Sequence, residues 1–283
     1  MSIVKEKIFL LDNRTIKCYT VFKTREDAML TKERIEKALL GFGRELPEIV
    51  FWNEIDSTNT RAKEYAKARD KSNKTPVVFI ANSQTAGRGR RGRSFVSNEG
   101  AGIFISILTY PDTKGADATA ATSKAAVALA NAIEHLCDCE IKIKWVNDLY
   151  LCGKKLAGIL TEGEMDDNGK IAYQVVGMGI NVYKSAISDE ISGIATSLES
   201  KLNCAPDRSE LAAKIIDDFF TERDDCHSEY KERSFIIGKE VTVIKLTETY
   251  KAKVIDINPD FSLTIDRNGE IERLFTGEIS LKV

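Results

Sequence analysis

The chain has 283 residues, of which 43% are hydrophobic and 30% are charged, a balance typical of folded globular proteins. Its 41 Lys and Arg residues nearly balance its 43 Asp and Glu residues, and the net charge of −2 argues against a protein that coats nucleic acid or an anionic membrane. No apolar run reaches the roughly 18–20 residues that a membrane span requires. The amino terminus has an apolar core of only IFLL, so we expect no secretory signal peptide.

The cysteines show no spacing typical of a metal site, and the chain has only two histidines. We therefore expect free thiols in a reducing compartment and predict a cytoplasmic protein. The six cysteines are Cys18, Cys137, Cys139, Cys152, Cys204 and Cys226.

Residues 1–47 are predicted to form a short amino-terminal extension. Within it, 7–11 and 15–22 have the pattern of two strands that could pair as a hairpin. Thr31 is a candidate N-cap for a following helix, which Gly41 is expected to stop.

Residues 48–233 are predicted to form one large domain of mixed strand and helix patterns. Asp167-Asn168-Gly169 is a strong hairpin signal, and several strands follow one another through short turns. The fold class is therefore α+β, with a mixed or antiparallel sheet flanked by helices. Strands are predicted at 49–55, 76–81, 102–108, 141–148, 154–165 and 170–182, and helices at 56–68, 117–136 and 209–232.

Residues 234–283 are predicted to form a separate small domain. Five short strand patterns occur there, with turn signals at Asn258-Pro259-Asp260 and Asn268-Gly269. About fifty residues of short strands favour a small closed β-barrel, because closure removes exposed strand edges.

The stretch TAGRGRRGRSF, residues 85–95, combines glycines with four arginines. Gly87 to Gly92 satisfies G-x-G-x-x-G, but no helical pattern follows, and a dinucleotide loop needs a helix N-terminus. The G-K-[ST] of a Walker loop is also missing from the sequence. Arginine forks bind phosphate or carboxylate, so we expect this loop to close over an anionic ligand. A solvated basic loop and an RNA-binding segment are the alternatives.

Three further stretches carry polar residues at the ends of elements. Asp56 to Asn59 begin a helix, where they could be a plain N-cap or part of a site. Lys144, Asn147 and Asp148 end an apolar strand, which is either an exposed edge or a site. Gly158 lies in a strand that begins with two lysines, and glycine in a strand often marks close approach of a ligand or another backbone.

Together, and in this order, these stretches resemble the biotin protein ligase family. The resemblance covers about residues 48–283. It implies a class II synthetase-like biotin/lipoate ligase fold, with 48–233 as the catalytic biotin and ATP domain and 234–283 as an SH3-like β-barrel. The motifs that carry it are Asp56-Ser57-Thr58-Asn59, Gly87 through Arg93, Lys144-Trp145-Val146-Asn147-Asp148, Lys155 through Leu160, and Gly177-Met178-Gly179-Ile180-Asn181.

The resemblance implies ATP-dependent ligation of biotin to a lysine of a biotin carboxyl carrier protein. Biotin's carboxylate first attacks the α-phosphate of ATP, giving biotinyl-5′-AMP and pyrophosphate, and the carrier lysine then attacks the mixed anhydride. It also implies Mg²⁺ as a cofactor, for which Asp148 is a weak candidate ligand. An arginine-rich loop suits this chemistry, because a carboxylate and a polyanion must be brought together.

The resemblance also assigns roles to individual residues. The implied catalytic residues are Arg90, Lys155 and Asp148. The implied biotin-binding residues are Ser57, Thr58, Asn59, Gln84, Gly87, Arg88, Arg90, Lys155, Gly158 and Gly177. The implied ATP-binding residues are Arg91, Arg93, Phe95, Lys144, Asn147 and Asn181.

Two positions depart from the family pattern: Val146 replaces the usual proline, and Phe95 replaces a frequent tryptophan. Some members carry a winged helix-turn-helix domain of about sixty residues before the catalytic domain. Residues 1–47 are too short for one, so we predict no specific DNA binding. We also predict no membrane association. A sheet edge in the central domain could pair two copies. The alternatives are a lipoate–protein ligase on the same fold and a biotin-responsive transcriptional repressor.

Overall fold

A computed structural model of the chain describes residues 10–11, 14–15, 29–111, 118–202, 205–221, 225–245, 247–275 and 278–280. Two short strands, β1 (Leu10–Leu11) and β2 (Arg14–Thr15), pair antiparallel at the amino terminus. The rest of the hairpin predicted there lies outside the described residues. In the part of the chain that is described, no helix is both long and apolar enough to cross a membrane.

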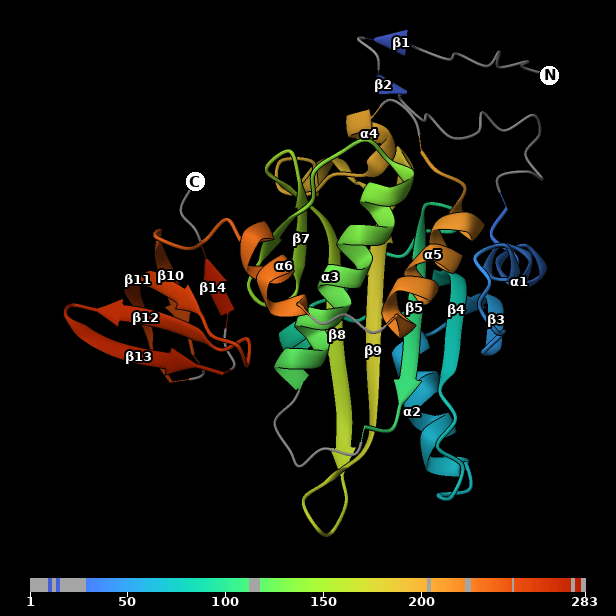
Figure 1. The fold of residues 1–283 in the computed structure, drawn as a ribbon, viewed down its shortest axis with the longest axis horizontal. Helices are drawn as coiled ribbons and strands as arrows, with labels where there is room; N and C mark the ends of the chain where they lie inside the picture. Colours follow the sequence, from blue (N-terminus) through green and yellow to red (C-terminus); the bar gives the residue numbers. More distant parts are fainter. Residues whose placement is uncertain are drawn as a thin grey trace.

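The centre of the molecule is a seven-stranded sheet with the order β3-β4-β5-β9-β8-β7-β6 (Figure 1). Only β3 and β4 pair in parallel, and the other neighbours are antiparallel, so the predicted mixed sheet is confirmed. The strands are β3 (Glu48–Ile55), β4 (Val77–Gln84), β5 (Gly102–Thr109), β6 (Lys142–Lys144), β7 (Asp148–Leu151), β8 (Lys154–Met165) and β9 (Ile171–Asn181).

Helices cover both faces of this sheet. Val78 and Ile80 of β4 belong to the main core under α3 and α5, whereas Val77 and Phe79 face the other way and pack with Ala62 of α2. This alternation is the period of two that a strand imposes on its side chains. The helices are α1 (Lys32–Gly41), α2 (Thr58–Ala68), α3 (Ala118–Leu136), α4 (Leu198–Leu202), α5 (Arg208–Phe220) and α6 (Cys226–Arg233).

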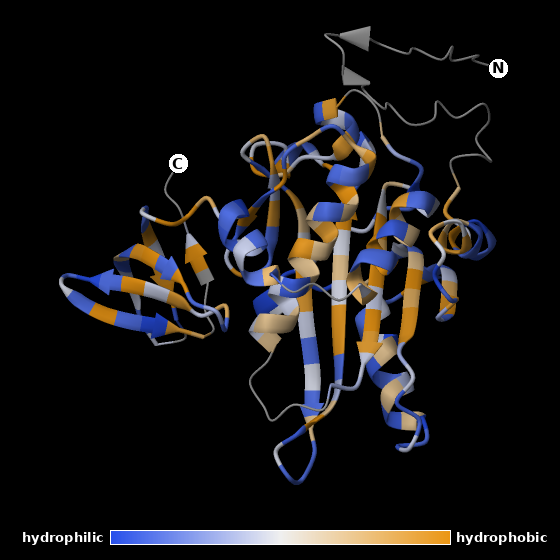
Figure 2. Cartoon of the chain, viewed as in Figure 1, coloured by the Kyte–Doolittle hydropathy of each residue, from blue (hydrophilic) through white to orange (hydrophobic). Residues whose placement is uncertain are grey.

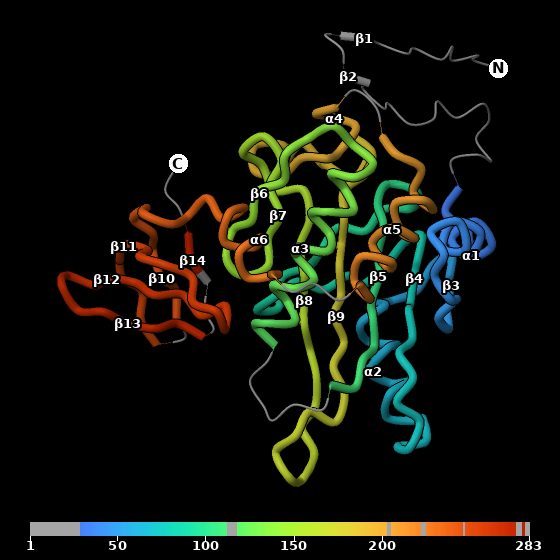
Figure 3. The backbone as a smooth tube through the Cα atoms, viewed as in Figure 1, coloured from blue at the N-terminus to red at the C-terminus, as the bar shows by residue number. Residues whose placement is uncertain are grey.

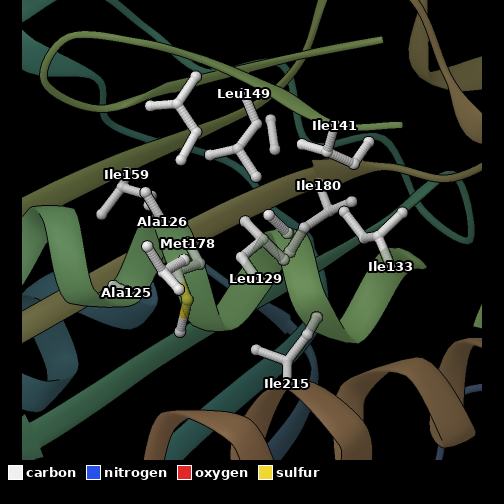
Figure 4. Packing of buried hydrophobic residues seen from close by; sticks show 14 of the residues in the cluster. Ala125, Ala126, Leu129, Ile133, Ile141, Leu149, Ile159, Met178, Ile180 and Ile215 are labelled. Carbon is white, nitrogen blue, oxygen red and sulfur yellow. The ribbon is translucent and has the colours of Figure 1, made fainter. Parts of the chain in front are cut away.

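Helix α3 lies along the middle of the sheet because small residues allow close approach. Figure 4 shows Ala125, Ala126 and Leu129 of α3 beside Met178 and Ile180 of β9, all of them buried. Figure 2 shows apolar residues concentrated in the central strands, whereas the turn of the β8–β9 hairpin is hydrophilic. The core therefore lies between α3 and the sheet, and leaves the opposite face of β8 and β9 for a site.

The carboxyl-terminal residues form a separate antiparallel sheet with the order β13-β12-β11-β10-β14, consistent with an SH3-like domain (Figure 3). It contacts the large sheet through the Trp145 indole, whose Nε1 donates to the Phe261 carbonyl oxygen at 2.8 Å. The strands are β10 (Glu240–Ile244), β11 (Thr249–Ile257), β12 (Leu263–Arg267), β13 (Glu270–Leu274) and β14 (Glu278–Ser280).

Two elements that were predicted to be continuous are each divided in two in the structure. The single strand expected at 141–148 is a hairpin of β6 and β7, because a turn at 145–147 reverses the chain. The single helix expected at 209–232 is two helices, because Asp225 begins α6 as a new N-cap that accepts from Ser228 N.

Two predicted helix starts are confirmed. Thr31 caps α1 by accepting from Arg34 N, and Ser57 caps α2 by accepting from Thr60 N. Gly41 is the last residue of α1 rather than the stop, and the positive φ of 74° occurs at Gly43.

Candidate active site

A cavity of about 820 Å³ lies over β8 and β9, on the sheet face that carries α2. Its floor is largely backbone, because Gly158 of β8 pairs with Gly179 of β9, and Gly177 lies two residues along the same face. Phe95 covers part of this floor: a Cβ atom on Gly179 would lie 2.7 Å from the Phe95 ring. Phe95, which replaces the frequent tryptophan, therefore still packs its ring on the glycine floor. It also lies edge-on to Phe104, with ring centroids 6.3 Å apart.

The structure brings nearly all of the predicted site residues together at this cavity. The exceptions are Gly87, which is buried beneath the loop, and Asn181, which is buried and donates to the Thr196 carbonyl oxygen at 3.2 Å. Those that line the cavity are Ser57, Thr58, Asn59, Gln84, Arg88, Arg90, Arg91, Arg93, Phe95, Lys144, Asn147, Asp148, Lys155, Gly158 and Gly177.

One end of the cavity is lined by polar, uncharged side chains, beside which Arg88 is neutralised by an ion pair with Glu162 at 3.3 Å. The Thr58 N–H donates to Gln84 Oε1 at 2.8 Å, which fixes the orientation of the Gln84 amide. Gln84 Nε2 then donates to Ser97 Oγ at 3.1 Å. This bond uses one of the two hydrogens on Nε2, and the other remains for a ligand. This end can therefore offer a neutral polar ligand a donor from Gln84 and the hydroxyl of Thr58.

The other end of the cavity is charged. Lys155 Nζ lies 2.6 Å from Asp148 Oδ1, across the paired strands β7 and β8. Arg90 Nη1 donates to Asn147 Oδ1 at 3.1 Å, and Asn147 Nδ2 donates to the Ile159 carbonyl oxygen at 3.0 Å. The turn that breaks the predicted strand thus places Asn147 beside Arg90 and Asp148 beside Lys155.

Across the described residues between the arginine loop and β5, no α-helix begins, as the sequence pattern predicts. The loop is closed at its base, where Phe95 N donates to the Gly87 carbonyl oxygen at 2.9 Å and Gly89 N donates to the Arg93 carbonyl oxygen at 2.7 Å. Its tip is a single 3-10 turn, Arg90–Gly92. Arg91 Nη2 reaches the Ile244 carbonyl oxygen of the carboxyl-terminal sheet at 2.7 Å. The loop therefore spans the cavity between the two sheets.

Val146, the other departure from the family pattern, is buried beneath this charged end. Its carbonyl oxygen accepts from the Tyr230 hydroxyl at 3.1 Å, and Tyr230 is itself fully buried in α6. The Trp145 bond to Phe261 holds the same turn from the other side. These contacts hold the turn in the absence of proline.

Three residues at or beside the cavity could not be found from the sequence. Ser106 of β5 lies inside an apolar strand, yet its Oγ is 2.6 Å from Asn59 Oδ1. Glu162 of β8 accepts from the amide of Asn59 at 3.0 Å. Tyr150 lines the charged end, and burial, with a smaller effect of Asp148, raises its pKa to about 12. The packing of α2 on the sheet brings Ser106 and Glu162 to Asn59.

The donor set does not make a magnesium site by itself. The described residues contain no group of three or more His, Cys, Asp or Glu side chains placed to hold a metal. Asp148 already faces the Lys155 ammonium, and Mg²⁺ in nucleotide enzymes is commonly bound through phosphates and one or two carboxylates.

Replacing Gly177 with alanine is expected to disturb the neutral end. A Cβ atom there would overlap Asn59 Oδ1, and Asn59 is held by the Leu160 carbonyl and Glu162. Forcing a methyl group into such a site costs about 1–3 kcal/mol. Thermal unfolding should show the loss, whereas Gly41→Ala, with open space around its added Cβ atom, should not lower the melting temperature. Equal melting temperatures for both variants would contradict the packing described here.

The chain is similar to known proteins in sequence and in fold. A model described as the biotin/lipoate A/B protein ligase family matches residues 52–181. The chain is 30% identical over 207 residues to a biotin–[acetyl-CoA-carboxylase] ligase of Mycobacterium tuberculosis, covering 68% of this chain and 75% of that protein. It is 29% identical over 245 residues to the bifunctional ligase/repressor BirA of Bacillus subtilis, covering 82% of this chain and 74% of that protein. A mutant biotin protein ligase from Aquifex aeolicus, solved in complex with biotin, superposes with a TM-score of 0.69 at 26% identity, covering 83% of this chain and 98% of that one.

Proposed function

This chain belongs to the biotin/lipoate A/B protein ligase family and is a biotin ligase, and we propose that it joins biotin to a lysine of a biotin carboxyl carrier protein through biotinyl-5′-AMP. The observation that carries the proposal is the division of one cavity into a neutral polar end and a charged end. Biotin has the same division, with an uncharged cyclic urea at one end and a carboxylate at the other. ATP supplies the phosphates that the arginines would face.

In the first step, a carboxylate oxygen of biotin forms a bond to the α-phosphorus of ATP, and the bond from that phosphorus to pyrophosphate breaks. Two anions approach one another, so cations must offset their repulsion. Arg90, at the edge of the cavity beside Asn147, and Lys155, opposite it, are the side chains that would do this. Arg91 and Arg93 would face the nucleotide phosphates, and Lys144 and Asn147 would complete the nucleotide end.

In the second step, the neutral amine of the carrier lysine attacks the acyl carbon, an amide bond forms and AMP leaves with the former carboxylate oxygen. The attacking amine must lose a proton, and Asp148 is the carboxylate nearest the reacting end. Its ion pair with Lys155 would keep that lysine directed at the acyl-phosphate oxygen. The arginine loop would limit the access of water to the adenylate while it waits for the carrier.

Asn181 and Gly87 would act through their neighbours. Asn181 holds the segment around Thr196, whose N–H in turn donates to the Lys155 carbonyl oxygen at 2.8 Å. A Cβ atom on Gly87 would lie 2.6 Å from Ser97 Oγ, the partner of Gln84. Each would therefore place a residue that contacts substrate. The lack of specific DNA binding, the pairing of two copies and the biotin carboxyl carrier protein as acceptor remain predictions.

The proposal is tested by incubating the protein with biotin, ATP and a purified biotin carboxyl carrier domain, and measuring the intact mass of the carrier. We expect one biotinyl group per carrier, and none on a carrier whose acceptor lysine is replaced by arginine. A parallel reaction with lipoate and a lipoyl domain tests the rival ligase. Modification of the lipoyl domain alone would overturn the assignment of biotin.

A further inference from the structure

Glu162 lies just behind the neutral end of the cavity and connects three elements. It is on β8, and its Oε1 lies 2.6 Å from Lys63 Nζ of α2 and 3.3 Å from Arg88 Nη2 of the arginine loop. Its Oε2 accepts from Asn59 Nδ2 at 3.0 Å. The side chain is only 19% exposed, so these contacts replace water around the carboxylate.

These contacts determine which way the Asn59 amide points. Asn59 Nδ2 lies 3.1 Å from the Leu160 carbonyl oxygen as well as 3.0 Å from the Glu162 carboxylate. Both groups accept hydrogen bonds and cannot donate, so the NH₂ group must face them. Asn59 Oδ1 therefore faces Ser106 Oγ, which is 2.6 Å away.

The orientation of Asn59 then fixes the hydroxyl hydrogens beyond it. The Ser106 hydroxyl has one hydrogen, and Asn59 Oδ1 has none. The two oxygens would repel each other at 2.6 Å unless that hydrogen lay between them, so Ser106 donates to Asn59. Thr58 Oγ1 lies 2.7 Å from Ser106 Oγ and 3.1 Å from Gln84 Oε1, both of which are then acceptors. The single hydrogen of the Thr58 hydroxyl is used within this network. Thr58 presents only lone pairs to the cavity.

We propose that Glu162 is a positioning residue that fixes the hydrogen-bond polarity of the neutral end, making Thr58 an acceptor for a ring N–H of the ligand. This inference rests on the proposed function, in which the ligand is a cyclic urea. Gln84 Nε2 supplies the matching donor for the urea carbonyl. Glu162 touches no substrate, and acts through Asn59, Ser106 and Thr58.

The surroundings of Glu162 keep it an acceptor. Burial would raise its pKa, but the hydrogen bonds from Lys63 and Asn59 outweigh burial and hold the pKa of Glu162 below its ordinary value. The carboxylate therefore stays ionised, and unable to donate, at neutral and mildly acidic pH. A neutral amide in its place would carry its own N–H donors, and would leave the Leu160 carbonyl oxygen as the remaining obligate acceptor that orients the Asn59 amide.

The test is Glu162→Gln, measured by biotin-dependent exchange of labelled pyrophosphate into ATP. We expect the KM for biotin to rise about tenfold or more, as when a buried N–H donor is left without its acceptor, with the KM for ATP changed less than about twofold. The matched control is Glu164→Gln. Glu164 is two residues along the same strand and binds Lys67 at 3.2 Å and the Tyr173 hydroxyl at 2.9 Å, but contacts no cavity residue in the described structure.

A second variant separates positioning from stability. Lys63→Met removes the ion pair with Glu162 but leaves the bond to Asn59, so it should lower the melting temperature while raising the KM for biotin less than Glu162→Gln does. If Lys63→Met and Glu162→Gln raise that KM equally, Glu162 is only a stabilising residue and the inference is wrong.

The decisive readout uses a biotin analogue with a ring oxygen in place of one urea N–H. The natural protein should reject it, because two lone pairs would face each other at Thr58, and Glu162→Gln should narrow the ratio of kcat/KM between biotin and the analogue. An unchanged ratio would overturn the inference. Failure of the natural protein to catalyse exchange with biotin would instead overturn the proposed function, so the two failures are distinguishable.

Discussion

Replacing Arg90 with alanine is expected to slow formation of the biotinyl adenylate about 10²- to 10³-fold, the usual effect of removing one group that stabilises transition-state charge. The Arg90 guanidinium is held at the charged end by Asn147, whose own amide is fixed by the Ile159 carbonyl oxygen. Biotin affinity, measured by calorimetry, should fall less than the rate, because the neutral end of the cavity is unchanged. Exchange of labelled pyrophosphate reports the rate.

Arg90→Lys provides the matched comparison. It keeps the positive charge but loses the planar fork that binds two oxygens at once, so it should recover only part of the rate. A control outside the cavity is Arg267→Ala, which removes an ion pair with Glu248 on the carboxyl-terminal sheet. An Arg90→Ala variant as active as the natural protein would contradict the role given to the loop.

Lys155→Met is expected to cause a loss of similar size, also about 10²- to 10³-fold. Methionine keeps much of the length of the side chain but removes the ammonium group opposite Arg90. It also leaves Asp148, whose side chain is only 19% exposed, without its cation 2.6 Å away. An unpaired carboxylate would then repel the carboxylate of biotin.

The double variant Lys155→Met, Asp148→Asn separates the two effects. Neutralising Asp148 should restore the melting temperature and part of the biotin affinity, because no buried charge is left unpaired. The rate of adenylate formation should stay low, because the stabilising cation is still missing. Recovery of the full rate would show that Lys155 serves only to neutralise Asp148.

Much of the site could be predicted because its residues lie in short segments at element ends. Ser57 and Thr58 begin a helix, and Lys155 and Gly158 lie at the start of a strand. Such segments carry their chemistry locally, so their order along the chain was enough to identify them. The division of the cavity into neutral and charged ends was not predicted, because it depends on where the fold places these segments.

The rest depended on contacts between distant residues. Ser106 and Glu162 meet Asn59 from two different strands, 47 and 103 residues away along the chain. Neither has a local pattern that distinguishes it from an ordinary strand residue. Gly177 was expected to admit biotin closely, whereas in the structure the Asn59 side chain occupies the space above it.

The errors of continuity have the same origin. The sequence KIKWVNDLYL is apolar enough for one strand, and tertiary contacts to Phe261, Tyr230 and Ile159 hold a turn in its middle. The break between α5 and α6 follows from a capping aspartate, Asp225, that amphipathic periodicity alone does not reveal. The boundaries of the three predicted domains stay a prediction, since most of 1–28 lies outside the described residues.

The measurement that tests the central claim most directly is biotin-dependent exchange of labelled pyrophosphate into ATP by the purified protein, with lipoate as the control acid. We predict exchange with biotin and none with lipoate, because the neutral end of the cavity is built from polar groups suited to a cyclic urea. Exchange with lipoate alone would contradict the choice of substrate while leaving the fold and the adenylation chemistry in place. No exchange with either acid would contradict the claim that this cavity activates a carboxylate.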